Sequence, residues 1–166
     1  METIFTRRSI RKYTDEKVSE EQVEKLLKAG MAAPSAGNEQ PWHFIVLTER
    51  DKMVKITDFH QYANMLNEAP VAIMVCGDTS LEKYKGYWVQ DCSAATQNIL
   101  LAAEDEGLGA VWLGVYPIED RIEGLKEMFD LPETVIPFCV IAIGHPAEEK
   151  EPADRYNKER VHYNQW

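Results

Sequence analysis

The sequence has few cysteines and no long apolar run. Its three cysteines, an odd number, all lie inside apolar segments: Cys76, Cys92 and Cys139. This placement favours buried thiols in a reducing compartment over a disulfide framework. The longest apolar stretches are far shorter than a membrane span, and the first residues lack the apolar core of a secretory signal. We therefore expect a cytoplasmic protein that does not enter a membrane.

Basic side chains are scarce and unevenly spread. The chain has 18 Lys and Arg against 28 Asp and Glu, a net charge of −10, and such a surface repels a polyanion. We therefore expect no nucleic acid partner. Two basic groups stand out from this background: Arg7, Arg8, Arg11 and Lys12 near the start, and Arg155, Lys158 and Arg160 near the end. They are either solvated surface patches or the walls of a pocket for one small anion, such as a phosphate ester.

Sequence motifs for protein-based catalysis are missing. Gly107 and Gly109 follow a predicted helix and precede a predicted strand, which is the reverse of the order in dinucleotide-binding folds. No P-loop is present, and the histidines and cysteines lack the spacing of metal ligands. No nucleophile elbow accompanies a Ser-His-Asp order. If the chain is an enzyme, a cofactor is expected to carry its chemistry.

Apolar periodicity divides the chain into alternating helices and strands. A capping box at Ser19–Gln22 begins a helix, which Pro34 ends after Ala33. Further helices are predicted over residues 51–65, 85–106 and 119–129, and strands over 44–47, 71–76, 110–113 and 138–143. Strands that are apolar throughout predict a sheet covered on both faces. A length of 166 residues fits a single domain.

Two segments raise the question of a partner subunit. Residues 99–103 are apolar nearly all round the predicted helix, so this part is buried either centrally or against another chain. The tail after Pro146 is polar but carries spaced aromatic residues, among them Tyr156, Tyr163 and Trp166. These side chains bury either on their own domain or across a partner subunit, as in a domain-swapped dimer.

Several motifs carry a resemblance to a known family. The segment RRSIRKY at 7–13 looks like the N-terminal motif of the nitroreductase family of flavoproteins. The segment APSAGNEQPWHF at 33–44 resembles the second motif of that family, at the expected distance. GLGAVWLG at 107–114, the strand end at 144–146 and HYNQW at 162–166 are also similar to short members. The resemblance covers essentially the whole chain.

The resemblance implies an α+β fold, a three-layer α/β/α sandwich with a central mixed sheet of four to five strands. It also implies a homodimer that holds two FMN molecules at its interface. The whole chain, residues 1–166, forms one FMN-binding domain in this interpretation. Its C-terminal tail, about residues 147–166, is expected to pack on the partner subunit.

The resemblance also assigns cofactor-binding residues. Arg7, Arg8 and Ser9 match positions that hold the phosphate and ribityl oxygens, where forked guanidinium donors suit a phosphate. Arg11 matches the position of a cation near the pyrimidine edge of the flavin, where it raises the flavin's potential. The loop from the other subunit, the strand beside the ring and the tail supply the remaining positions: Pro34, Ser35, Ala36, Asn38, Gln40, Trp112, Leu113, Gly114, Lys158 and Arg160.

Some of these assignments compete with simple packing. Trp42 is expected to be a core anchor, whereas Trp112 and Leu113 are equally compatible with core packing and with a place beside the flavin. Tyr84, Tyr87 and Trp88 form either a substrate lid or interface core. No side chain is assigned a catalytic role, and no metal ligands are identified.

The implied activity is hydride transfer from NAD(P)H through flavin N5 to a small electrophile, such as a nitroaromatic or a quinone, by a ping-pong mechanism. The sequence leaves the physiological acceptor and the choice between NADH and NADPH open. A family relative with different flavin chemistry (enoate reduction, dehalogenation or flavin fragmentation) and a non-enzymatic flavin-binding protein remain alternatives. The resemblance aligns residues 117–119 with the backbone contact to flavin N5 in longer relatives, from which this chain differs in loop length.

Overall fold

A computed structural model describes residues 2–166. Its strands are β1 (Trp42–Leu47), β2 (Val71–Asp78), β3 (Gly109–Gly114) and β4 (Val135–Gly144). Its α-helices are α1 (Glu2–Thr6), α2 (Glu20–Met31), α3 (Arg50–Ile56), α4 (Trp88–Asp105) and α5 (Glu119–Met128). Short 3₁₀ turns are η1 (Ala36–Asn38), η2 (Asn64–Asn67), η3 (Thr79–Leu81) and η4 (Lys158–Arg160). Within residues 2–166, no helix has the length and apolar character needed to cross a membrane.

The four strands form one sheet in the order β1-β2-β4-β3. Every pair of neighbours is antiparallel, so the expected mixed character is wrong for these four strands. A parallel contact occurs as a single bridge between Ser9 and Ala110, where the N-terminal segment meets the outer edge of β3. The prediction of four to five strands is met by four in this protomer.

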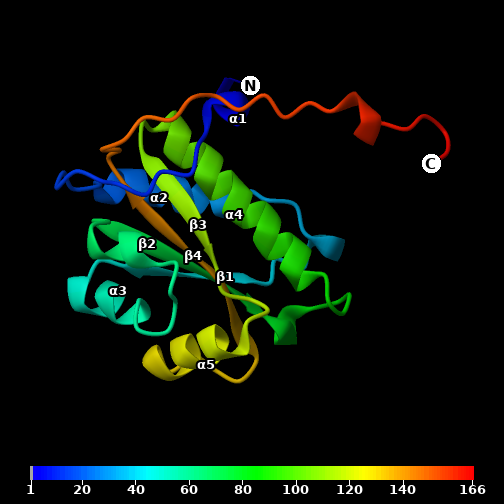
Figure 1. The fold of residues 1–166 in the computed structure, drawn as a ribbon. Helices are drawn as coiled ribbons and strands as arrows, with labels where there is room; N and C mark the ends of the chain where they lie inside the picture. Colours follow the sequence, from blue (N-terminus) through cyan, green and yellow to red (C-terminus); the bar gives the residue numbers. More distant parts are fainter. Residues whose placement is uncertain (1) are drawn as a thin grey trace.

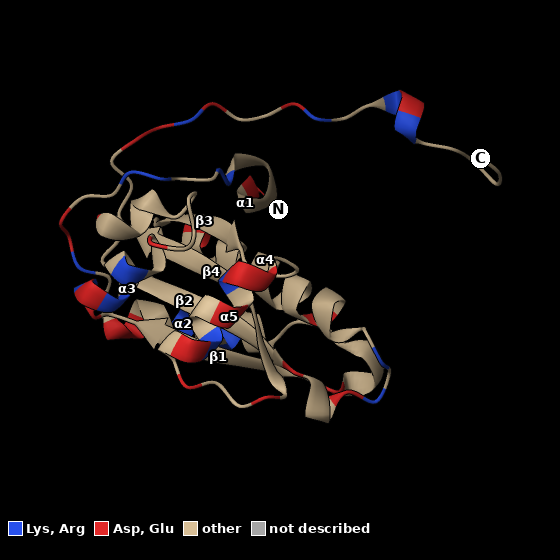
Figure 2. Cartoon of the chain, turned by 60° about the horizontal axis from the view of Figure 1, so that its bottom comes forward, with Lys and Arg blue, Asp and Glu red and all other residues tan. Residues whose placement is uncertain are grey.

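Helices cover both faces of the sheet, as the apolar strands predicted (Figure 1). Alternate residues of β2 point to opposite sides: Ile73 and Val75 pack toward α2 and α4, whereas Ala72 and Met74 belong to the core on the side of α3 and α5. The two cores make the protein a three-layer α/β/α sandwich. Charged residues lie on the helices and connecting segments, and the strands are almost free of them (Figure 2).

Helix α4 packs against its own domain, which accounts for the buried residues of the segment 99–103, whereas Leu101 and Ala102 stay partly exposed. It contacts all four strands as well as α1 and α2. Ile99 and Ala103 are fully buried in the core. Trp88, at the first turn, lies directly over Gly77 of β2, where a Cβ would overlap the indole ring. Glycine at this position is therefore required for the close approach of α4 to the sheet.

The predicted helix over 51–65 is wrong beyond Ile56. Helix α3 ends there, and the chain continues through turns to the 3₁₀ turn η2. The Thr57 hydroxyl donates to the carbonyl of Val54 (2.7 Å), which competes with helix continuation. The side chain of His60 is buried and bonds to the carbonyl of Gly114 instead of lying on a helix surface. Tertiary contacts have overridden the apolar periodicity in this segment.

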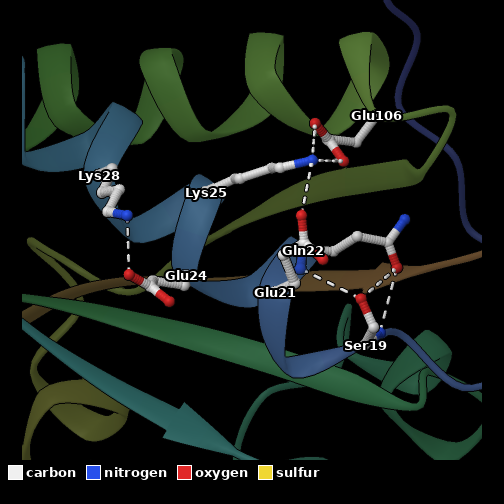
Figure 3. Close-up of polar contacts among 7 residues, drawn as sticks. All are labelled: Ser19, Glu21, Gln22, Glu24, Lys25, Lys28 and Glu106. Atoms are coloured by element: carbon white, nitrogen blue, oxygen red, sulfur yellow. Dashed lines mark hydrogen bonds and ion pairs between the residues drawn. The ribbon is translucent and has the colours of Figure 1, made fainter.

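The start of α2 confirms the predicted capping box (Figure 3). The Ser19 hydroxyl oxygen accepts from the Gln22 amide, and the Gln22 side chain accepts from the Ser19 amide, both at 3.1 Å. Further along α2, Lys25 pairs with Glu106 just beyond α4 at 3.1 Å. This pair is partly exposed, so it contributes little to stability beyond fixing the relative position of the two helices.

The tail first follows the N-terminal segment, to which residues 147–151 are hydrogen-bonded, and then runs away from the domain as an extended segment that contains η4 (Figure 1). Its aromatic side chains are bare in the single protomer: Tyr156 is 77% exposed, Tyr163 81% and Trp166 99%. The tail therefore does not bury its aromatic residues on its own domain, which was one of the two alternatives. The other, burial on a partner subunit, stays a prediction.

Replacing the capping serine tests whether the capping box stabilises the domain. Ser19→Ala removes the acceptor for the Gln22 amide, and we expect the free energy of unfolding to fall by about 1 kcal/mol. Ser19→Asp, which keeps an acceptor next to the positive end of the helix, should retain the wild-type value. Chemical denaturation followed by circular dichroism measures both; equal stability of the two variants would contradict the role of the cap.

Candidate functional site

The N-terminal basic segment lies along the outer edge of β3. The Ile10 amide donates to the carbonyl of Ala110 at 3.1 Å, next to the bridge between Ser9 and Ala110. Tyr13 is buried below and donates from its hydroxyl to the carbonyls of Ile10 (2.7 Å) and Ala142 (3.1 Å). This pairing fixes which way the side chains of residues 7–12 point, and it brings Arg11 toward the end of β3.

A cavity of about 430 Å³ opens at that end of the strand. Its volume lies within the range of small-molecule sites in proteins. Four of its lining residues were predicted as site residues: Arg11, Trp112, Leu113 and Gly114. Arg11 lies far from the other three in the sequence. The other lining residues belong to β3, to the turns after α3 and to the first turn of α5: Val111, His60, Gln61, Tyr62, Asn64, Met65 and Arg121.

The side chains of His60 and Arg121 converge on the carbonyl of Gly114 in this cavity. His60 Nε2 lies 2.9 Å from the oxygen, and Arg121 Nη1 donates to it at 2.7 Å. Since a carbonyl only accepts, Nε2 of His60 carries the hydrogen. Burial lowers the pKa of His60 below its ordinary value, and the positive charge of Arg121 lowers it further. A neutral imidazole therefore holds the end of β3 in place.

Arg121 and Tyr62 border the cavity together. The guanidinium carbon of Arg121 lies 5.8 Å from the centre of the Tyr62 ring, in a cation–π arrangement. Together with Arg11 it gives the cavity two guanidinium groups in an otherwise acidic protein. The site can therefore accept an electron-rich or anionic group of a planar ligand.

Arg7 and Arg8 lie nearer the start of the tail. Arg8 Nε donates to the carbonyl of Glu151 at 2.8 Å, whereas its buried Nη2 has no partner among residues 2–166. Partial burial lowers the pKa of Arg7, and the charges of Arg155 and Arg8 lower it further. Three guanidinium groups near one another, one with an unused donor, are suited to an anion such as a phosphate.

The segment 34–40 forms a tight loop away from this cavity. Its backbone is fixed by the Ser35 hydroxyl, which accepts from the Gln40 amide at 3.0 Å, and by the Gln40 side chain, which donates to Asn38 Oδ1 at 2.8 Å. The amide of Ala36 donates to Asp91 Oδ1 of α4 at 3.0 Å. Pro34 is exposed. None of these loop residues lines the cavity beside β3 in the same protomer.

The remaining site predictions have separate outcomes in this protomer. Lys158 and Arg160 belong to η4 in the tail (Figure 1), and neither residue lines the cavity. Trp42 is a buried core residue, as expected. Trp88 is also core, edge-on to Tyr116 at 4.8 Å, so it belongs to neither a lid nor an exposed interface patch. Trp112 is half-buried: it packs edge-on against Phe138 and also lines the cavity.

Sequence reasoning missed the cavity wall at residues 60–65. The available signal was the run of poor helix formers from Thr57 to Asn64, which argued against a continuous helix. It also missed the buried pair Glu39 and Asp91, because carboxylates on a loop and on a helix surface are expected in solvent. Among residues 2–166, no cluster of three or more possible metal ligands is present.

Comparison with known proteins identifies the family. The model of the Nitroreductase family matches residues 4–62 and 59–145. A Methanothermobacter thermautotrophicus protein named "Putative NADH dehydrogenase/NAD(P)H nitroreductase" is 56% identical over all of this chain and 87% of its own length. A solved structure of the same name, from Parabacteroides distasonis ATCC 8503, is 46% identical with a TM-score of 0.96 and covers 99% of this chain and 97% of its own.

A third match is named for its cofactor. The solved structure of an FMN-dependent nitroreductase from Clostridium difficile R20291 is 30% identical to this chain, with a TM-score of 0.92. It covers 99% of this chain and 98% of its own. The sequence motifs, the three-layer fold and these matches over nearly the full length agree with one another. This chain belongs to the nitroreductase family.

Proposed function

We propose that this chain is an FMN-dependent oxidoreductase that uses NAD(P)H to reduce small electrophilic acceptors. The cavity beside β3 is the observation that carries the proposal, because it combines an apolar strand wall with amide and guanidinium groups. Family membership and relatives named for FMN and NAD(P)H support it. The chemistry that a bound FMN would supply is hydride transfer between NAD(P)H and a second substrate that takes the place of the first.

The residues present fit the two ends of FMN. Arg11 provides a cation for the electron-rich pyrimidine edge, and the amides of Gln61 and Asn64 provide donors and acceptors in the same cavity. The half-buried face of Trp112 supplies an apolar wall for a planar ring. Arg7 and Arg8 form the phosphate end, where the unpaired Nη2 of Arg8 is a spare donor.

A second copy of the chain completes this site in our proposal. The loop 34–40 and the basic residues Lys158 and Arg160 lie away from the cavity in one protomer, so they reach a flavin only from a partner subunit. Apolar side chains of α1 and α2 are bare in the single protomer: Ile4 is 57% exposed, Phe5 64% and Met31 56%. Such a patch beside an aromatic tail is typical of a dimer interface.

The chain contributes position and environment more than acid–base chemistry. His60 and Arg121 fix the carbonyl of Gly114, and the rigid end of β3 would help to orient a bound ring. Arg11 stabilises negative charge at the pyrimidine edge. Tyr84 and Tyr87 are exposed and neither lines the cavity beside β3, so they form no lid over it in one protomer, and we expect a broad range of small acceptors.

The first test is an absorbance spectrum of the purified protein. We expect a yellow protein with one FMN per chain, whose flavin absorbance bleaches under anaerobic NADH or NADPH and returns when a nitroaromatic is added. Bleaching by one coenzyme alone would identify the preferred donor. A colourless protein that takes up no FMN would overturn the proposal, and a flavin that neither coenzyme reduces would indicate a flavin-binding protein without this activity.

Removing the cation in the cavity tests the placement of the ring. Arg11→Gln should weaken FMN binding by about tenfold to a hundredfold, because a hydrogen bond from a charged donor is worth about 1.5–3 kcal/mol. It should also lower the reduction potential of the bound flavin. Lys12→Gln removes the same charge from an exposed neighbour outside the cavity and is the matched control. Fluorescence titration with FMN measures both; equal affinities would place the ring elsewhere.

Removing the end of the tail tests the dimer. A chain that ends after Ala153 keeps the carbonyl of Glu151 that Arg8 contacts but lacks the aromatic residues and η4. We expect this variant to fold, to be monomeric at concentrations where the full chain is a dimer, and to bind FMN much more weakly. Light scattering and FMN titration give the result; a dimer with unchanged FMN affinity would refute the partner role of the tail.

A further inference from the structure

Two buried carboxyl groups meet behind the loop 34–40. Glu39 is 7% exposed and Asp91, in the first turn of α4, is 4% exposed. One oxygen of each group is anchored on backbone amides. Asp91 Oδ1 accepts from Ala36 at 3.0 Å, and Glu39 Oε2 accepts from Lys83 at 2.7 Å and from Tyr84 at 3.1 Å. Each carboxyl group is therefore fixed through one oxygen, and its second oxygen is buried.

Each carboxyl group also has one oxygen without a hydrogen-bond donor. Glu39 Oε1 and Asp91 Oδ2 are buried, and neither has a donor among residues 2–166. The two groups lie close enough for each to affect the pKa of the other. Two ionised carboxylates at such a distance, both out of water, repel strongly, whereas a single proton between them makes a hydrogen bond. A single proton held between the two groups would give both of these oxygens a partner.

The surroundings assign that proton to Asp91. Burial raises the pKa of Asp91, and the neighbouring charges of Glu39 and Glu82 raise it further. Burial also pushes the pKa of Glu39 upward, but the amides of Lys83 and Tyr84 and the Asp91 side chain outweigh it, so the net shift is downward. The nearby charges of Glu82 and Lys83 oppose each other. Asp91 is accordingly the donor and Glu39 the acceptor.

This pair connects three segments of the chain. Asp91 belongs to α4, Glu39 to the loop 34–40, and the amides that Glu39 accepts belong to the segment 82–87. The Lys83 ammonium group donates to the carbonyl of Gly37 at 3.1 Å. A Cβ on Gly37 would be only 2.5 Å from the Tyr84 ring, so the ring lies directly on the loop backbone. These contacts couple the loop 34–40 to the segment 82–87.

We propose that Glu39 and Asp91 share one proton and act as a positioning pair, which holds the loop 34–40 and the segment 82–87 in the arrangement that flavin binding requires. This inference rests on the proposed function for the role of the loop, whereas the shared proton itself does not. Neither residue touches the cavity, so the pair acts through the backbone of the loop. Loss of the proton at high pH leaves two buried negative charges and releases both segments.

The proton can be observed directly in flavin-free protein. At neutral pH we expect an infrared carbonyl stretch of a protonated carboxylic acid in the wild type, which disappears in Asp91→Asn. Glu82→Gln, which removes the neighbouring charge but leaves the pair intact, is the matched control and should keep the band. A wild-type spectrum without this band at neutral pH, or a band that Asp91→Asn leaves in place, would overturn the shared proton.

Amide variants distinguish a shared proton from ordinary packing. In Asp91→Asn the new NH₂ group takes the place of the donor, and in Glu39→Gln it donates in the opposite direction, so each single variant preserves one hydrogen bond. In the double variant, the outer amides fix both carbonyl oxygens outward, and two NH₂ groups face each other. We expect the amides of Ala36, Lys83 and Tyr84 to keep their hydrogen-exchange protection in the singles and to lose about tenfold or more in the double.

The pH dependence and the FMN affinity complete the test. Protection of these amides should fall at high pH in the wild type and stay constant in Asp91→Asn, whose donor cannot ionise. The double variant should bind FMN at least about tenfold more weakly. Equal protection in all four proteins would refute the positioning pair. If protection changes as expected but no variant, including the wild type, binds FMN, the pair stands and the proposed function fails.

Discussion

Burial of both faces of a four-stranded sheet is the constraint on which the rest of the structure depends. Strands β2 and β4 are almost entirely buried, so helices must cover them on each side, and only the outer edges are available for other contacts. The N-terminal basic segment takes the outer edge of β3. Its pairing there brings Arg11 to the open end of the strand, and the cavity forms where the cover of the sheet ends.

Much of this fold could be predicted because its helices and strands have strong local signals. The capping box at Ser19, the apolar strands and the long helix of residues 88–105 agree between pattern and structure. The helix predicted over 51–65 failed where His60 turns inward to hold a carbonyl from a distant strand. Periodicity reports which residues are apolar, but it does not report a polar side chain that is buried by a single long-range hydrogen bond.

The sequence motifs identified candidate site residues, but they did not reveal the buried residues that hold the nearby loop in place. Arg11 and residues 112–114 line one cavity although they are about a hundred positions apart, and their contact with a flavin stays a prediction. Glu39 stands inside the second motif, yet its carboxylate faces inward to Asp91, a residue that no local pattern connects to it. Such pairs depend on the distance between segments after folding, which a single sequence does not contain.

The exposed aromatic tail and the net negative charge have opposite effects on contacts with other proteins. A lone protomer displays Trp166 and Tyr163 almost fully to water, together with apolar side chains on α1 and α2, and such surfaces adhere to other proteins without selectivity. An overall charge of −10 opposes contacts with other acidic surfaces at long range. A second copy carries the same charge, so a dimer can form only where matching apolar patches outweigh the repulsion between the two copies.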